Sequence, residues 1–164
     1  MNDGEHTDTP PRSTAARTLP EPMAHYLDGT DLLRKTQALR VSTVDADGWP
    51  HDALLSAGDA VVVSPRSLRF ALFPQSATAA NVTRDSRVTI TLACDRGMCE
   101  VRLRARRLEP SEMPLAMFEA TVEDARMHVA PYADVSSGVT FRLHDPETVL
   151  ARWERQIAAL RSAG

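Results

Sequence analysis

Short segments in which apolar and polar residues alternate follow one another through the middle of the chain. A period of two is typical of a strand with one buried and one exposed face. Turn-forming residues separate these segments, as at Asp45–Gly48 and Gly58–Asp59. The pattern predicts strands at residues 39–44, 51–56, 60–63, 68–73, 87–94, 99–108 and 139–143.

Other segments have features typical of helices. Ser76 is placed to N-cap a short, Ala-rich helix that reaches Asn81. Apolar residues recur at helical spacing over Leu115–Val129, which predicts a second helix, capped by Ser111. Asp145 followed by proline predicts the start of a C-terminal helix. Its apolar face comprises Val149, Leu150, Trp153, Ile157 and Leu160, and a shorter helix or two broken turns are expected within residues 23–33.

Many short strands with tight turns and few helices predict a mainly β, α+β fold, a small antiparallel barrel with peripheral helices. A chain of 164 residues is long enough for one domain with a sizeable core. Residues 1–22 contain almost no large apolar side chain and cannot offset the entropy of ordering. We therefore expect a disordered N-terminal tail at 1–22 and a domain at 23–164.

Composition and charge argue against nucleic-acid-binding, membrane-spanning and secreted classes of protein. The net charge of −3 provides no overall field that would attract nucleic acid. No apolar run approaches the length of a membrane span, and no segment resembles a signal peptide. Two cysteines are too few for a secreted disulfide scaffold, which favours a cytoplasmic protein. Cys94 and Cys99 flank a four-residue turn, where we expect free thiols.

The first turn of the helix after Ser76 is a candidate anion site. Free backbone N–H groups and the positive end of the helix dipole meet there, and Ser76 and Thr78 add two hydroxyls. A phosphate can dock at such a position. The alternative is that Ser76 only caps the helix and Thr78 faces solvent, and the residues themselves leave both interpretations open.

Other candidate residues have simpler explanations beside functional ones. His51 follows the first turn and is either an acid–base or ligand contact or a surface histidine. His128 and His144 are far apart, and no carboxylate spacing completes a metal site. The arginines at 102, 104, 106 and 107 form a basic edge without interleaved aromatic residues, which favours a solvated strand face with ion pairs over a nucleic-acid surface.

Four short segments occur in an order and at spacings that match one protein family. They are Ala38–His51, Leu68–Phe73, Ser76–Asn81 and Arg84–Val88. Through them residues 33–108 resemble the split-barrel flavoproteins related to pyridoxamine 5′-phosphate oxidase. The resemblance covers about half of the chain and implies a six-stranded antiparallel split β-barrel.

The resemblance also implies a homodimer with FMN sites at the subunit interface. Family members include oxidases, flavin reductases, heme-degrading relatives, deazaflavin-dependent reductases and proteins without a demonstrated cofactor. In FMN-binding members the phosphate lies near an Arg on the first strand and a Ser-Arg-Lys stretch on the short helix. Carried over, the cofactor-binding residues are Arg40, Val41, Ser42, Thr43, Leu72, Ser76, Thr78 and Glu100.

The chain departs from the family pattern at the phosphate site. Ala77 and Thr78 stand where the family has Arg and Lys, and Glu100 stands where the oxidases often have Gln. A charge-assisted hydrogen bond is worth about 1.5–3 kcal/mol, so losing one weakens flavin binding about tenfold to a hundredfold. The departures therefore leave two functions open: an FMN-dependent oxidoreductase acting on a small molecule, or a non-catalytic, cofactor-free ligand-binding member. A heme- or deazaflavin-binding variant is a third. We assign no catalytic residue.

Overall fold

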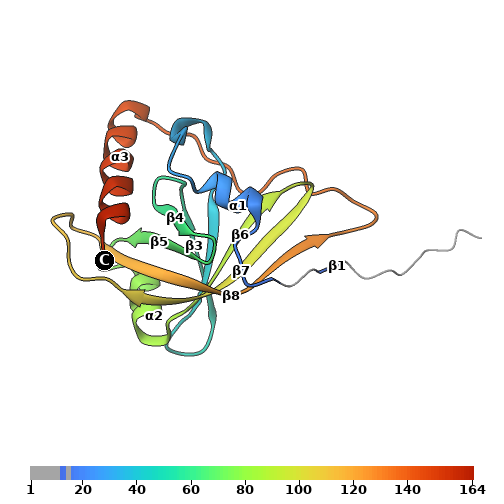
Figure 1. The fold of residues 1–164 in the computed structure, drawn as a ribbon, viewed down its shortest axis with the longest axis horizontal. Coiled ribbons are helices and arrows are strands. Elements are labelled where there is room, and N and C mark those ends of the chain that lie inside the picture. The colour runs from blue at the N-terminus through green and yellow to red at the C-terminus, as the bar shows by residue number, and fades with distance from the viewer. Residues whose placement is uncertain (1–11, 14–15) are drawn as a thin grey trace, which may run out of the picture.

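The structure is a computed structural model that describes residues 12–13 and 16–164. The described part is mainly β, with helices placed around one antiparallel sheet (Figure 1). The strands are β1 (Arg12–Ser13), β2 (Leu39–Val44), β3 (Pro50–Leu55), β4 (Ala60–Ser64), β5 (Ser67–Leu72), β6 (Arg87–Cys94), β7 (Gly97–Arg107) and β8 (Ala116–Val129). The helices are α1 (Glu21–Tyr26), the 3₁₀ turn η1 (Leu32–Arg34), α2 (Ala77–Asp85) and α3 (Pro146–Ser162).

The strands pair in the order β3-β2-β6-β7-β8-β5-β4, and β1 pairs with β8. Every pair is antiparallel, which confirms the predicted mainly β class with peripheral helices. The predicted number of six strands is wrong, because seven strands lie on this path. Among the described residues no pairing joins β3 to β4, so the ends of the sheet stay open.

Local sequence signals place most of these elements correctly. The Ser76 side chain accepts a hydrogen bond from Ala79 N at 3.1 Å and begins α2 as predicted. Asp145 accepts from Thr148 N at 3.2 Å and begins α3. On β7 the residues alternate between buried and exposed, because one face covers the core and the other meets water.

The helix predicted over Leu115–Val129 is wrong: these residues form β8, which pairs with both β5 and β7. Phe118 and Val122 point inward with the strand period, but a bulge opposite Arg102–Leu103 shifts the register of β8. The next buried residue is therefore Ala125, three positions after Val122. Because the spacing of buried residues changes from two to three at the bulge, the apolar pattern in the sequence resembles that of an amphipathic helix.

The strand predicted at residues 139–143 is also wrong. The structure places no strand there and instead has an extended segment with isolated contacts. Thr140 forms a single bridge with Gln37, and Phe141 N donates to Thr36 O at 2.9 Å. The segment lies beside residues 36–38, just before β2, and its contacts are too few to form a ladder.

Part of the predicted tail lies outside the described residues, namely residues 1–11 and 14–15. The described part lies against the sheet. β1 pairs with β8, Ala16 bridges to Ala125, and Leu19 is buried. α1 begins at Glu21, one residue before the expected end of the tail, because Met23 and Leu27 fill the core beneath it.

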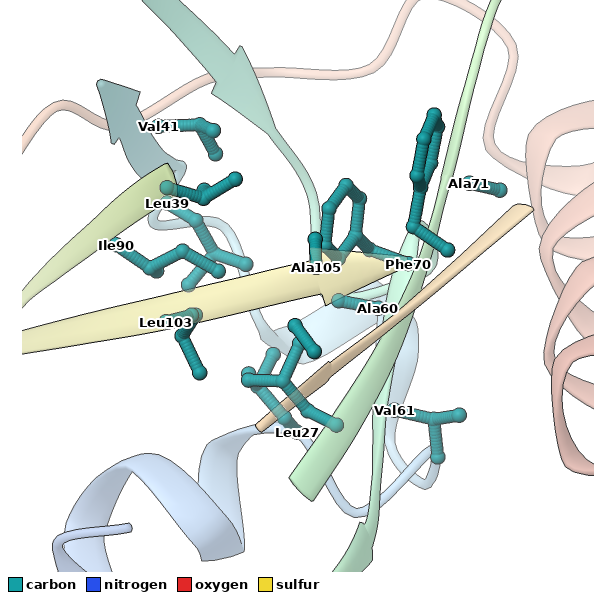
Figure 2. Packing of buried hydrophobic residues seen from close by; sticks show 14 of the residues in the cluster. Leu27, Leu39, Val41, Ala60, Val61, Phe70, Ala71, Ile90, Leu103 and Ala105 are labelled. Atoms are coloured by element: carbon teal, nitrogen blue, oxygen red, sulfur yellow. The ribbon is translucent and has the colours of Figure 1, made fainter. Parts of the chain in front are cut away.

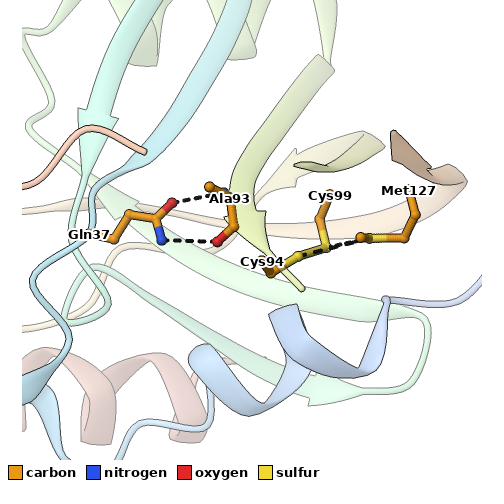
Figure 3. Close-up of a disulfide and its surroundings, with 5 residues drawn as sticks. All are labelled: Gln37, Ala93, Cys94, Cys99 and Met127. Carbon is orange, nitrogen blue, oxygen red and sulfur yellow. Dashed lines mark hydrogen bonds between the residues drawn. A yellow bond between two sulfur atoms is a disulfide. The ribbon is translucent and has the colours of Figure 1, made fainter. Parts of the chain in front are cut away.

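The two cysteines are paired, so the expectation of free thiols is wrong. Cys94 and Cys99 form a disulfide across the β6–β7 turn, with their Cα atoms 6.5 Å apart (Figure 3). The sulfur of Met127 on β8 lies 3.0 Å from Cys99 Sγ. Gln37 holds the adjoining strand end through two hydrogen bonds with the backbone of Ala93. Together these contacts tie the end of the hairpin to its neighbours.

The core lies on the inner face of the curved sheet. Figure 2 shows Leu39 and Val41 of β2 beside Ile90 and Leu103, while Phe70 lies further along the same interior. The Phe70 and Phe118 rings stack with centroids 5.4 Å apart and join β5 to β8. No described helix is long and apolar enough to cross a membrane.

α3 stands beside β4 and β5 in Figure 1 and docks on the Gly58–Asp59 turn. A Cβ atom on Gly58 would lie 2.1 Å from Cγ of Trp153, so the indole packs directly on the glycine backbone. The Phe141 ring meets the indole edge-on, with centroids 6.3 Å apart. Gln156 Nε2 donates to Gly58 O at 3.1 Å and to Asp59 Oδ1 at 2.8 Å.

Arg69 of β5 holds the far end of the same helix. Its Nη1 donates to the carbonyls of Leu160 and Arg161 at 2.9 and 3.2 Å, where the helix dipole favours a cation. Its Nε donates to Glu119 of β8 at 2.8 Å. The hydrogen bond from Arg69, with a second from Arg106, lowers the pKa of Glu119 from its usual 4.5.

We predict that Gly58→Ala destabilises the protein by about 1–3 kcal/mol, because the new methyl group overlaps the indole of Trp153. Trp153→Leu on the Gly58→Ala background should restore space. Urea unfolding of the two single variants and the double variant measures the coupling. Additive losses would show that Gly58 and Trp153 do not share this space.

We also predict that Glu119→Gln lowers the free energy of unfolding at neutral pH, and that the difference from wild type shrinks on acidification. A carboxyl group with a lowered folded pKa stabilises the protein above its unfolded pKa and loses this contribution as pH falls through the folded value. Urea midpoints from pH 7 to pH 3 measure the difference. The exposed Glu112→Gln is the control. A difference that stays constant with pH would contradict the role of the Glu119 charge.

Candidate functional site

A cavity of about 230 Å³ lies where the first turn of α2 meets β3, the end of β5 and α3. We call it the α2 cavity. Three of the residues predicted to bind a cofactor, Leu72, Ser76 and Thr78, line it together. Apolar side chains from β3 and from the segment after β5, including Leu54 and Phe73, form the rest of its rim.

The first turn of α2 carries hydrogen-bond donors beside this cavity, which Ser76 and Thr78 line. Ser76 Oγ accepts a hydrogen bond from Ala79 N, and the O–H of Ser76 is therefore free to donate to a ligand. The N–H groups of Ala77 and Thr78 have no acceptor among the described residues, as expected for the first positions of a helix. Ala77 is exposed and Thr78 is 4% exposed, so only position 77 has room for a long cation.

Polar contacts hold α2 on the sheet. Thr78 Oγ1 lies 3.3 Å from His51 Nε2 of β3, which places His51 against the helix and not in a loop. Asn81 Nδ2 donates to Thr43 Oγ1 of β2 at 3.1 Å, and both side chains are buried. Thr43 therefore positions the helix, and its hydroxyl is occupied by this contact.

Arg40 lies on the outer face of the sheet, away from the α2 cavity. Its Nη2 donates to Asp52 Oδ2 at 2.6 Å, and Ser42 donates to the other oxygen of the same carboxylate. Hydrogen bonds from Ser42 and then Arg40 lower the pKa of Asp52. The positive charge of Arg40 is thus already matched by a carboxylate.

The remaining predicted residues lie on different faces of the sheet, because successive side chains of a strand point to opposite faces. Val41 points into the core (Figure 2) and is fully buried. Ser42 and Thr43 line a second hollow, whereas Arg40 lines a third. Glu100 Oε2 lies 3.0 Å from His128 Nε2 on the outer face of the sheet. The structure therefore brings Leu72, Ser76 and Thr78 together and places Arg40, Val41, Ser42, Thr43 and Glu100 elsewhere.

Two residues of α3 that the sequence reasoning missed also line the α2 cavity, Arg152 and Gln156. Gln156 is 3% exposed and interrupts the apolar stripe that contains Trp153 and Leu160. A polar residue in such a stripe is a signal that the sequence does contain. Nothing in the local sequence distinguishes Arg152 from other exposed arginines.

Within the described residues no group of three or more His, Cys, Asp or Glu side chains is arranged to hold a metal ion. The arginines of β7 form ion pairs with carboxylates on the neighbouring strand or their own: Arg102 with Glu100, Arg104 with Glu123 and Arg106 with Glu119. This confirms the predicted ion pairs for three of the four arginines, whereas Arg107 is exposed and has no carboxylate partner among the described residues.

Comparison with known proteins gives one curated relative and several similar structures. The uncharacterized protein YclD of Bacillus subtilis is 35% identical over 139 residues, which cover 82% of this chain and 90% of YclD. No model of a known protein family matches the chain.

Among solved structures, a putative pyridoxamine 5′-phosphate oxidase from Lactobacillus delbrueckii superposes with a TM-score of 0.53 at 20% identity, covering 71% of this chain and 98% of its own. A histidine-to-alanine variant of HupZ from Group A Streptococcus superposes with a TM-score of 0.50 at 16% identity, covering 65% and 97%. At these identities the similarity concerns the fold. The open antiparallel sheet of this chain thus has the fold of pyridoxamine 5′-phosphate oxidase-like proteins, as the resemblance of residues 33–108 predicts.

Proposed function

The chain belongs to the family of YclD from Bacillus subtilis and has a pyridoxamine 5′-phosphate oxidase-like fold, and from this premise we propose that it is an FMN-binding oxidoreductase acting on a small-molecule substrate. In this proposal the sheet corresponds to the split barrel of that fold. A homodimer with cofactor sites at its interface is part of the proposal. The observation that carries it is the α2 cavity, where Leu72, Ser76 and Thr78 meet.

The chemistry of the α2 cavity suits the phosphate end of a flavin. Two free N–H groups at Ala77 and Thr78, the hydroxyl of Ser76 and the positive end of the α2 dipole all favour an anion. Leu72 and Leu115 supply apolar wall, as in pockets where a few polar groups orient a mainly apolar ligand.

The size of the cavity limits what it can enclose. Pockets that enclose a whole ligand of drug size measure about 300–1,000 Å³, whereas this one measures about 230 Å³. It therefore suits a phosphate and the chain that carries it. A ring system would extend to the rim, where Phe73 is 67% exposed and Leu54 is 54% exposed. Exposed apolar side chains of this size are also suited to the surface of a partner subunit.

A bound flavin would supply hydride and electron transfer, and the chain would bind and orient it. Ser76 and the first-turn amides of α2 would hold the phosphate. His51, whose Nε2 lies 3.3 Å from Thr78 Oγ1, is the titratable histidine beside this turn.

A second candidate function is a cofactor-free, ligand-binding member of the same fold. The observation that favours it is the ion pair between Arg40 and Asp52. The arginine that the resemblance assigns to phosphate is paired with Asp52 at 2.6 Å, and α2 carries no cation in its first turn. A chain without these charges would bind FMN weakly and would suit a less charged ligand.

We predict that the purified protein binds FMN saturably at micromolar concentrations, with flavin fluorescence as the measure. Ser76→Ala should weaken binding, because it removes both a phosphate donor and the cap of α2. Ser111→Ala, an exposed serine outside the α2 cavity, should bind as wild type does. Absence of saturable binding at tens of micromolar FMN would reject the flavin proposal in favour of the second candidate.

We further predict that Ala77→Arg raises FMN affinity about tenfold to a hundredfold, since the exposed position allows one charge-assisted hydrogen bond to the phosphate. Ala158→Arg adds the same charge at an exposed site that lines a different hollow and serves as the control. Parallel titrations of both variants and wild type provide the comparison. Equal affinities would show that the first turn of α2 does not face the phosphate.

A further inference from the structure

We infer that Arg152 of α3 supplies the cation for a phosphate monoester in the α2 cavity, in place of the cations that α2 itself lacks. The inference rests on the proposed function, because it concerns the same cavity. It adds a specificity-determining residue on another element, and extends the ligand from FMN to phosphate monoesters on a hydroxylated chain. Arg152 lies far from Ser76 in sequence, and the docking of α3 brings both to one cavity.

Arg152 differs from most arginines of the sheet in having no partner among the described residues. Seven of the described arginines, Arg40, Arg69, Arg87, Arg102, Arg104, Arg106 and Arg126, donate to carboxylates at close range. In the described part of the chain no ion pair or hydrogen bond engages the Arg152 side chain, although it lines a cavity. A guanidinium in this state can form a bidentate pair with phosphate without breaking an internal contact.

Gln156 gives a second and independent indication of a ligand. Its side chain is 3% exposed and lines the same cavity. The Nε2 group donates to Gly58 O and to Asp59 Oδ1, and these two hydrogen bonds fix the orientation of the amide. No described donor reaches its Oε1. A carbonyl oxygen that is held in place without a donor suits a ligand hydroxyl.

Asp59 also lines the cavity and carries the opposite charge. Its Oδ2 accepts from Ser56 N at 2.8 Å and from Ser56 Oγ at 2.7 Å, and its Oδ1 accepts from Gln156. Three protein donors thus satisfy this carboxylate, which leaves it no need of the donors at α2. The donors at α2 and the cation at Arg152 remain for a ligand, which favours a phosphate over a neutral group.

The test compares FMN with riboflavin, which lacks the phosphate. We expect Arg152→Gln to weaken FMN binding about tenfold to a hundredfold while riboflavin affinity changes less than about twofold. Arg152→Lys should recover part of the loss, because it restores charge without the planar fork. Arg155→Gln removes the same charge from the same helix at a residue that lines a different hollow, and should bind as wild type does.

A second arm uses ribose 5-phosphate, a phosphate monoester without a flavin, and the thermal midpoint as readout. If wild type binds no FMN but millimolar ribose 5-phosphate raises the midpoint of wild type and not of Arg152→Gln, the flavin proposal fails and this inference holds. If wild type binds FMN and Arg152→Gln binds it equally well, this inference fails and the flavin proposal holds. If Arg152→Gln changes the binding of neither FMN nor ribose 5-phosphate, Arg152 is only a solvated surface arginine and the inference is overturned.

Discussion

The docking of α3 on the Gly58–Asp59 turn is the contact on which the candidate site depends. The indole of Trp153 rests on the glycine backbone, where any larger residue would overlap it, and Gln156 bonds to the same turn. Arg69 holds the other end of the helix from β5. Held at its middle and at its C-terminal end, α3 forms one wall of the α2 cavity.

The same contact brings polar groups of α3 to the cavity, where the chain departs from the phosphate pattern that the resemblance implies. In the resemblance, the anion is held by an arginine of the first strand and by cations of the short helix. Here Arg40 is matched by Asp52 on the outer face of the sheet, and α2 begins without a cation. A helix from the end of the chain instead contributes polar groups to the cavity. The fold is thus shared, while the polar groups that meet in the cavity come from a different element.

Prediction from the sequence succeeded where the signal is local. The caps of α2 and α3 at Ser76 and Asp145 and the turn at Gly48 are each decided by neighbours within four residues. It failed for β8, because the bulge opposite Arg102–Leu103 depends on register with another strand and changes the apparent period. It also failed for the segment at residues 139–143, whose β-forming residues have no strand to pair with beyond isolated contacts.

Local sequence alone determined the alternating faces of β2 and β7, the first turn of α2 and the apolar stripe of α3, because backbone preference and side-chain period operate over short distances. Only the tertiary structure decided which residues from distant segments lie together. It placed Val41 in the core and Arg40 beside Asp52, and it brought Arg152 and Gln156 to Ser76. It also brought Cys94, Cys99 and Met127 together at one end of the sheet. These proximities arise from strand register and helix docking, which are set by packing between segments distant in the chain.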